Sequence, residues 1–105
     1  MYKAEIIEAI QNQMMLKIVF RKIDDSVVTR DIAPYDVYPQ ENKKTHLTRD
    51  ILAGWAKRDL QKEEHQARVY LDTIQSMTLL NEPFNGPKIR RLMEVREQPK
   101  VQRNW

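Results

Sequence analysis

The sequence predicts a mainly β domain with flanking helices, and three observations support this fold class. The chain opens on one apolar stripe, whose three- and four-residue spacing predicts an amphipathic helix over residues 3–14: Ile6, Ile7, Ile10 and Met14. Several short segments after it alternate apolar and polar residues, which is the period of a half-buried strand. Prolines and polar stretches separate these segments. We therefore expect a helix followed by about five short strands.

The first two strands are expected to form a hairpin. Residues 15–23 alternate and are rich in β-branched and aromatic side chains, which favours a strand. The polar turn of residues 24–26 leads into a second strand from Val27 to Ala33. We expect Pro34 to end that strand, because proline cannot donate a hydrogen bond to a neighbouring strand.

The middle of the chain supplies one more strand between polar segments. Residues 35–38 are expected to form a short extended piece, which Pro39 closes, and residues 40–50 a surface loop. The next strand is predicted from Ile51 to Ala56, and a charged loop follows it up to residue 66.

The clearest alternation lies in residues 67–74. One face carries Ala67, Val69 and Leu71, and the other carries Arg68, Tyr70 and Asp72. The second face thus places a cation, an aromatic ring and a carboxylate in one row. Two interpretations stay open: a solvent face with cross-strand pairs, or one wall of a polar cleft that binds an anionic or nucleobase-bearing ligand.

The last part of the chain is expected to be less regular. Residues 75–80 supply a final apolar piece, residues 81–87 a connecting segment and residues 88–97 a short helix that Pro99 ends. The last six residues are expected to be disordered.

These elements together predict a barrel. Five strands of this size tend to roll up so that few strand edges stay exposed. We expect a small five-stranded barrel of the SH3 or Sm type, capped by the N-terminal helix, over residues 1–85. Residues 86–105 are expected to form a basic tail.

Composition limits the class of protein. A chain of 105 residues with 41% hydrophobic and 31% charged residues suits one domain with a modest core. No run approaches the roughly 18–20 apolar residues that span a bilayer, and the first residues lack the apolar core of a secretory signal. The absence of cysteine excludes disulfides and thiolate chemistry. The simplest placement is the cytoplasm of a prokaryotic-type cell.

Positive charge is concentrated in the tail. The net charge is +3, and residues 86–105 hold six basic and two acidic residues, which leaves the rest of the chain nearly neutral. Such a tail indicates contact with phosphates or with an acidic partner, or it is simply solvated.

Arg30 and Arg68 are the strongest candidates for a binding role. Each is predicted in the middle of a strand, where a guanidinium needs solvent or an anion, and its planar fork binds phosphate or carboxylate through two hydrogen bonds. If their strands are neighbours, the two forks face one cleft. The alternative is a structural pairing with Asp31 or Asp72.

Tyr70 and Trp55 are candidates for stacking a nucleobase, although Trp55 shares a face with apolar residues and also suits a core. His46 and His65 lie in separate polar loops, which argues against a metal site. The sequence contains no serine–histidine–acid arrangement and no glycine-rich phosphate loop. We therefore expect no enzymatic activity, no cofactor and no metal.

The order of these segments resembles the WYL domain, an Sm/SH3-like β-barrel of bacterial transcription regulators and of proteins linked to phage defence. The resemblance covers about residues 3–84. The matching stretches are the leading helix that ends Glu8-Ala9-Ile10, and then Leu16-Lys17-Ile18-Val19-Phe20, Arg30-Asp31-Ile32-Ala33-Pro34, Ile51-Leu52-Ala53-Gly54-Trp55 and Arg68-Val69-Tyr70-Leu71-Asp72-Thr73-Ile74. Of the tripeptide that names the family only Leu52 is present, and Thr73 stands where the family has a second arginine.

The resemblance implies a regulatory module that binds a nucleotide or single-stranded nucleic acid through Arg30, Arg68, Tyr70 and Trp55. Binding would change how the module engages a transcription or defence partner. The alternative is a protein-interaction module whose ligand cleft has decayed, in which the basic tail or a strand edge docks a partner. A homodimer through strand edges fits either case.

Overall fold

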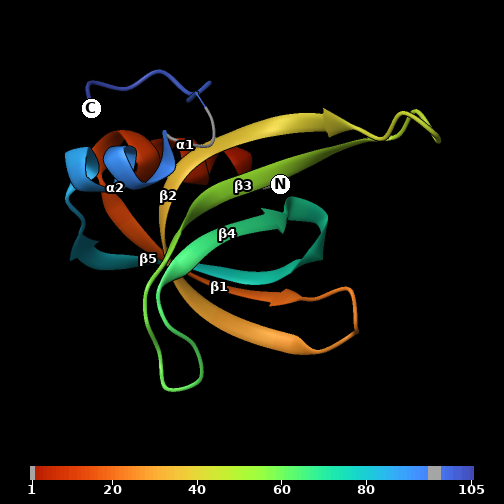
Figure 1. The fold of residues 1–105 in the computed structure, drawn as a ribbon, viewed down its shortest axis with the longest axis horizontal. Helices are drawn as coiled ribbons and strands as arrows, with labels where there is room; N and C mark the ends of the chain where they lie inside the picture. Colours follow the sequence, from red (N-terminus) through yellow and green to blue (C-terminus); the bar gives the residue numbers. More distant parts are fainter. Residues whose placement is uncertain (1, 95–97) are drawn as a thin grey trace.

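The computed structural model describes residues 2–94 and 98–105, and it shows a mainly β fold with two α-helices (Figure 1). The elements in chain order are α1 (Lys3–Asn12), β1 (Met14–Arg21), β2 (Val27–Glu41), β3 (Thr48–Ala56), β4 (His65–Tyr70), a 3-10 turn (Leu71–Thr73), β5 (Ile74–Pro83) and α2 (Gly86–Met93). The strands form one antiparallel sheet in the order β4-β3-β2-β1-β5. Figure 1 shows the sheet strongly bent, with both helices at one end of it.

The predicted helix and the first hairpin are confirmed. Helix α1 ends two residues early, at Asn12, because Gln13 adopts a left-handed conformation with φ of 56° and caps the helix through its backbone N–H. Strands β1 and β2 pair as expected, with Phe20 opposite Val28.

The prediction that Pro34 ends the second strand is wrong. Strand β2 continues to Glu41 and takes up residues 35–38 and Pro39. The register against β3 shifts between Pro34 and Asp36, so Tyr35 is the extra residue of a bulge. A bulge leaves one position without a regular ladder bond, and proline is tolerated there. The predicted loop of residues 40–50 shrinks accordingly, because both of its ends belong to strands.

The predicted strand of residues 67–74 is correct only to Tyr70. The 3-10 turn then carries the chain from β4 to β5 at the opposite edge of the sheet, and the Thr73 hydroxyl donates to the Tyr70 carbonyl at 2.7 Å. Residues 81–83 extend β5 and residues 86–87 begin α2, so the expected connecting segment is also shorter. Within the described residues no ladder joins β4 to β5, so the sheet is open.

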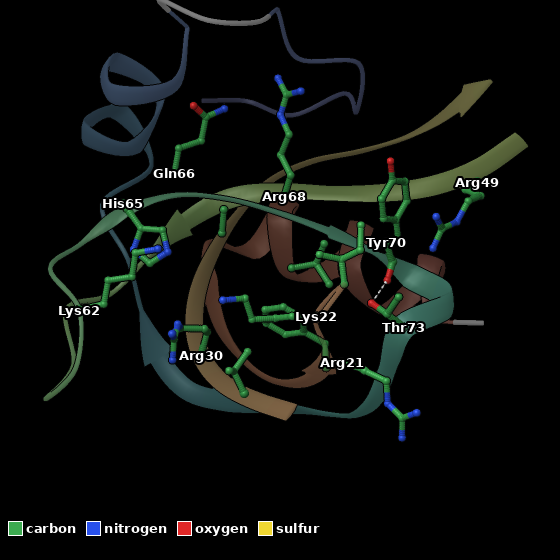
Figure 2. A pocket seen from close by; sticks show the side chains of 15 residues that line it. Arg21, Lys22, Arg30, Arg49, Lys62, His65, Gln66, Arg68, Tyr70 and Thr73 are labelled. Atoms are coloured by element: carbon green, nitrogen blue, oxygen red, sulfur yellow. Dashed lines mark hydrogen bonds between the residues drawn. The ribbon is translucent and has the colours of Figure 1, made fainter. Parts of the chain in front are cut away.

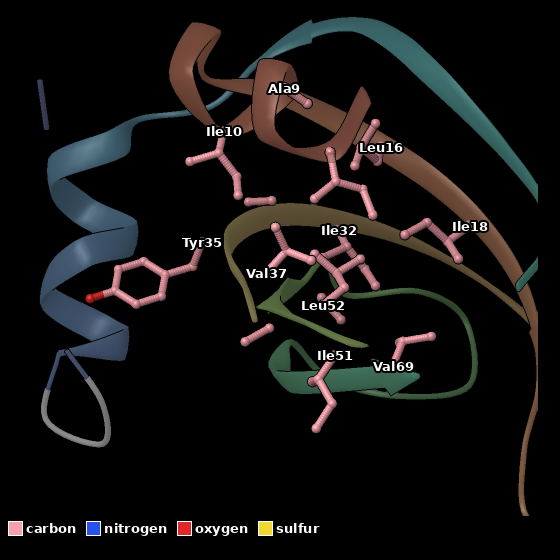
Figure 3. Packing of buried hydrophobic residues seen from close by; sticks show 14 of the residues in the cluster. Ala9, Ile10, Leu16, Ile18, Ile32, Tyr35, Val37, Ile51, Leu52 and Val69 are labelled. Atoms are coloured by element: carbon pink, nitrogen blue, oxygen red, sulfur yellow. The ribbon is translucent and has the colours of Figure 1, made fainter. Parts of the chain in front are cut away.

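The core lies between α1 and the concave face of the sheet (Figure 3). The side chains of Leu16, Ile18, Ile32, Leu52 and Val69 are at most 2% exposed. Burying each such side chain contributes about 1.5–3 kcal/mol, so this cluster dominates the stability of the fold.

The last residues are packed on the domain, which corrects the expectation of disorder. Trp105 is 7% exposed and its Nε1–H donates to the Ile10 carbonyl at 2.7 Å. Backbone N–H groups of Lys100 and Val101 donate to Asp36. We call residues 98–105 the C-terminal strap. Of the helix expected over residues 88–97, residues 95–97 lie outside the described part.

Candidate anion-binding site

A hollow of about 480 Å³ opens between β4 and the β1–β2 hairpin (Figure 2). Its basic lining residues are Arg21, Lys22, Arg30, Arg49, Lys62, His65 and Arg68. None of the described residues that line it is an aspartate or a glutamate. Such a surface attracts anions, although Asp25, Asp59 and Asp72 lie outside the lining and pair with three of its arginines.

The register of the strands decides which of these side chains share a face of the sheet. Ile32 lies opposite Ala56, and Ala56 opposite His65, so these three residues are on one face. Arg30 is two residues before Ile32 and therefore shares the face of His65. Figure 2 shows Arg30, His65 and Lys62 gathered at one end of the hollow, with Lys22 near its middle. Four basic groups thus surround one space.

Asp59 fixes the position of Arg30. The Arg30 Nη1 donates to Asp59 Oδ2 at 3.0 Å and to the Thr29 carbonyl at 3.0 Å. Asp59 Oδ1 in turn accepts the backbone N–H groups of Gln61 and Lys62, each at 2.8 Å. These two hydrogen bonds, and then the Arg30 charge, hold the pKa of Asp59 below its ordinary value. The same carboxylate therefore anchors both Arg30 and the loop that carries Lys62.

The two lysines of the hollow, Lys22 and Lys62, carry much of its positive charge. In the part of the chain that the structure describes, neither the Lys22 nor the Lys62 ammonium makes an ion pair. His65 adds an imidazole ring at the same end of the hollow as Lys62. Its Nδ1 lies 2.9 Å from the Glu63 carbonyl, an acceptor only, so Nδ1 carries the proton. Nε2 is left to accept a hydrogen bond when the ring is neutral and to donate when it is charged.

Arg68 does not converge with Arg30. Arg68 lies opposite Ala53, and Ala53 opposite Asp36, on the face of the sheet away from His65. Figure 2 shows the Arg68 side chain pointing from β4 away from Arg30. The alternation of β4 decides this arrangement, because Arg68 stands three residues after His65, which shares the face of Arg30. Arg68 therefore borders the hollow from the convex face.

Tyr70 shares the convex face with Arg68 and is already stacked. The Arg49 guanidinium lies 3.6 Å from the centre of the Tyr70 ring and donates to both oxygens of Asp72, at 2.8 and 2.6 Å. The hydrogen bond from Arg49 lowers the pKa of Asp72. Tyr70 remains 39% exposed, so part of its ring still faces solvent. Sequence reasoning missed Arg49, because its segment was expected to be a loop.

Trp55 lies apart from the other three candidates. It is half-buried and lines a second hollow of about 220 Å³, together with Lys57, Glu82 and Phe84. Its Nε1–H is buried and has no acceptor among the described residues. Trp55 therefore does not contribute to the basic hollow.

The structure was also searched for a metal site and for a membrane-spanning helix. Residues 2–94 and 98–105 contain no group of three or more histidine, aspartate or glutamate side chains placed to hold a metal ion. The His46 Nδ1 lies 3.1 Å from Glu41 Oε1, near the loop between β2 and β3. In the same described ranges, neither α-helix has the length and apolar character needed to cross a membrane.

No family model, no curated protein and no solved structure matches this chain. The likeness to the WYL domain therefore stays a prediction from the sequence.

Proposed function

We propose that this chain is a regulatory binding module that takes a nucleotide or a single-stranded nucleic acid in the basic hollow. The observation that carries the proposal is the convergence of Lys22, Arg30, Lys62 and His65 on one space that no described carboxylate lines. The phosphate backbone supplies most of the affinity in complexes of this kind, and basic side chains supply its counter-charge.

The binding residues differ in part from those expected from the sequence. Arg30 is retained, whereas Lys22, Lys62 and His65 take the place of Arg68, Tyr70 and Trp55. Phe20 and Val28 add apolar surface to the same hollow, which suits the face of a base or sugar. Arg68 and Tyr70, on the convex side of β4, suit the next nucleotide of a longer single-stranded nucleic acid.

The fold supports the same proposal. A strongly bent antiparallel sheet, with a three-residue turn between its two edge strands, is the arrangement expected of a small barrel of the SH3 or Sm type. With the segments matched in order to the WYL domain, this favours a module of that class. The module would then regulate a partner protein in transcription or in phage defence.

Fluorescence polarisation with a labelled oligonucleotide and a labelled nucleotide, over a salt series, tests the proposal. The Lys22→Gln/Lys62→Gln variant is expected to bind at least tenfold more weakly, with a salt slope reduced by about 1.4 for a single strand. The matched control is Lys43→Gln/Lys44→Gln, which removes two exposed lysines from the β2–β3 loop. Equal affinity in both variants would contradict the proposal.

A protein-interaction module is the second candidate, because β4 and β5 are both edge strands. Leu79 on β5 is 60% exposed, and an exposed edge with apolar side chains can pair with another chain. Under this candidate the wild-type protein binds neither probe. It then forms a concentration-dependent homodimer in analytical ultracentrifugation.

A further inference from the structure

The C-terminal strap lies on the domain as an extended peptide lies in a binding groove. Its residues alternate in exposure: Pro99, Val101, Arg103 and Trp105 face the domain, whereas Gln98, Lys100, Gln102 and Asn104 are exposed. The strap belongs to no β-ladder, so side chains of the domain hold it. We call the surface beneath it, formed by Ile10, Tyr35 and Asp36, the strap groove.

Asp36 recognises the backbone of the strap. Its Oδ2 accepts the N–H of Lys100 at 2.9 Å, and its Oδ1 accepts the N–H of Val101 at 2.9 Å. Oδ1 also accepts the N–H of Val37 at 3.0 Å. Asp36 is the one fully buried charged residue in the described part of the chain. A carboxylate that accepts backbone N–H groups recognises an extended peptide regardless of its exposed side chains.

Aromatic rings recognise the end of the strap. The Arg103 guanidinium lies 4.7 Å from the Tyr35 ring and 4.6 Å from the Trp105 ring, which places the cation against both. Trp105 also meets Phe84 edge to face, at 5.5 Å between ring centres. Its Nε1–H reaches the Ile10 carbonyl, and its own carbonyl accepts from Arg90 Nη1 at 2.8 Å. The strap thus presents to this surface a cation followed two residues later by an aromatic ring.

Arg103 is also the weak point of this docking. Its side chain is 3% exposed, and Nη1 and Nη2 have no hydrogen-bond partner among the described residues. Its Nη2 lies 3.8 Å from Asp36 Oδ1, too far for a hydrogen bond. Burial lowers the pKa of Arg103, as expected when a cation is removed from water. When the strap leaves the groove, both nitrogens regain water, so release is less costly than it is for an apolar segment.

We infer that the strap groove is a peptide-binding site, which the strap occupies in cis and a partner peptide of the same chemistry occupies in trans. The partner peptide is extended and carries an arginine two residues before a tryptophan or another aromatic residue. Its backbone N–H groups bind Asp36, its cation packs on Tyr35, and its aromatic ring fills the site of Trp105. This inference is independent of the basic hollow, because Asp36 lies on the opposite face of the sheet from Arg30.

A competition experiment on the full chain tests the inference. A fluorescein-labelled peptide with the sequence of residues 98–105 is titrated with three proteins: wild type, Arg103→Ala/Trp105→Ala, and the same variant with Asp36→Asn added. The double variant has a weakened strap and an intact groove, so it is expected to bind the peptide at least tenfold more tightly than wild type. Adding Asp36→Asn is expected to reverse this gain. Gln102→Ala/Asn104→Ala, which changes only outward-facing strap side chains, is expected to behave as wild type.

Failure to bind the peptide overturns the inference if the double variant keeps the circular dichroism spectrum of wild type. If that variant does not fold, amide hydrogen exchange on the wild-type chain decides. The Lys100 and Val101 amides are then expected to exchange at least 100-fold faster than the Leu52 amide, because the strap opens by itself. Equal protection of all three amides would make the strap a fixed part of the core and overturn the inference.

Discussion

Pro34 and Asp36 stand two residues apart in β2, yet their side chains lie on opposite faces of the sheet. Pro34 is opposite Gly54 and Asp36 is opposite Ala53, its direct neighbour in β3. One extra residue in β2 therefore separates a part of the strand in which Arg30 lines the basic hollow from a part in which Asp36 holds the strap. Without the bulge, Arg30 and Asp36 would share a face, because they are an even number of residues apart in β2.

The bulge depends on the small size of Gly54. A Cβ at this position would lie 2.5 Å from the Ala33 carbonyl oxygen and 2.7 Å from Ile32 Cγ2. The backbone oxygen cannot move without disturbing the β2–β3 ladder, so we expect Gly54→Ala to lower the free energy of unfolding by about 1–3 kcal/mol. Urea denaturation measures this loss, with the exposed Thr78→Ala on β5 as a control that stays within about 0.5 kcal/mol. If Gly54→Ala lowers the free energy of unfolding no more than the control does, β2 and β3 can move apart at Gly54 at little cost, and the bulge does not depend on its small size.

Asp36 and Arg103 are expected to be energetically coupled, although no hydrogen bond joins them. Asp36→Asn removes the charge that faces the guanidinium, and Arg103→Met removes the cation at similar volume. We expect each single substitution to lower the free energy of unfolding by about 1–3 kcal/mol, because each leaves a buried charge less compensated. The double substitution is expected to cost less than the sum, with a coupling of about 1 kcal/mol or more. Additive losses in urea denaturation would show that the two side chains contribute separately.

Much of the fold followed from local patterns. The apolar stripe of α1 and the alternation of β1, β3 and β4 were sufficient to predict these elements, because each of them buries one face against the core. The bulge in β2 was not predictable in this way. It depends on the close approach of Gly54 to the backbone of Ala33, and these residues are far apart in the sequence.

The candidate site was predictable only in part, for related reasons. Arg30 was found from its place in a strand, but Lys22 and Lys62 lie in a turn and a loop, whose positions depend on tertiary contacts such as that of Asp59. The strap has the alternation of an extended segment, with Val101, Arg103 and Trp105 on one side. Its binding partner Asp36 is 64 residues from Lys100, so the local pattern of the last residues does not reveal that they pack on the domain.

Tyr35 is expected to limit stability at alkaline pH. It is fully buried, and burial raises its pKa above the ordinary value. A group whose pKa is raised in the folded state contributes stability that is present below its unfolded pKa, about 10, and is lost as the pH rises through the folded value. The free energy of unfolding should therefore fall above about pH 10, and Tyr35→Phe should flatten that fall. Urea denaturation at pH 7, 9, 10 and 11 measures both curves. A constant difference between wild type and variant over this range would exclude Tyr35 as the titrating group.

Asp72 is expected to act at the other end of the pH range. The hydrogen bond from Arg49 lowers its pKa, so the carboxylate contributes stability that is present above its unfolded pKa, about 4, and lost as the pH falls through the folded value. The Asp72 side chain is 57% exposed, which limits this contribution to at most about 1 kcal/mol and makes it sensitive to salt. We expect Asp72→Asn to be less stable than wild type at pH 7 in low salt, and this difference should shrink at pH 2.5 and at high salt. Arg49→Lys is expected to lose a similar amount, because lysine lacks the fork that binds both oxygens of Asp72. A difference that is unchanged between pH 7 and pH 2.5 would show that Asp72 stabilises the protein by its shape and not by its charge.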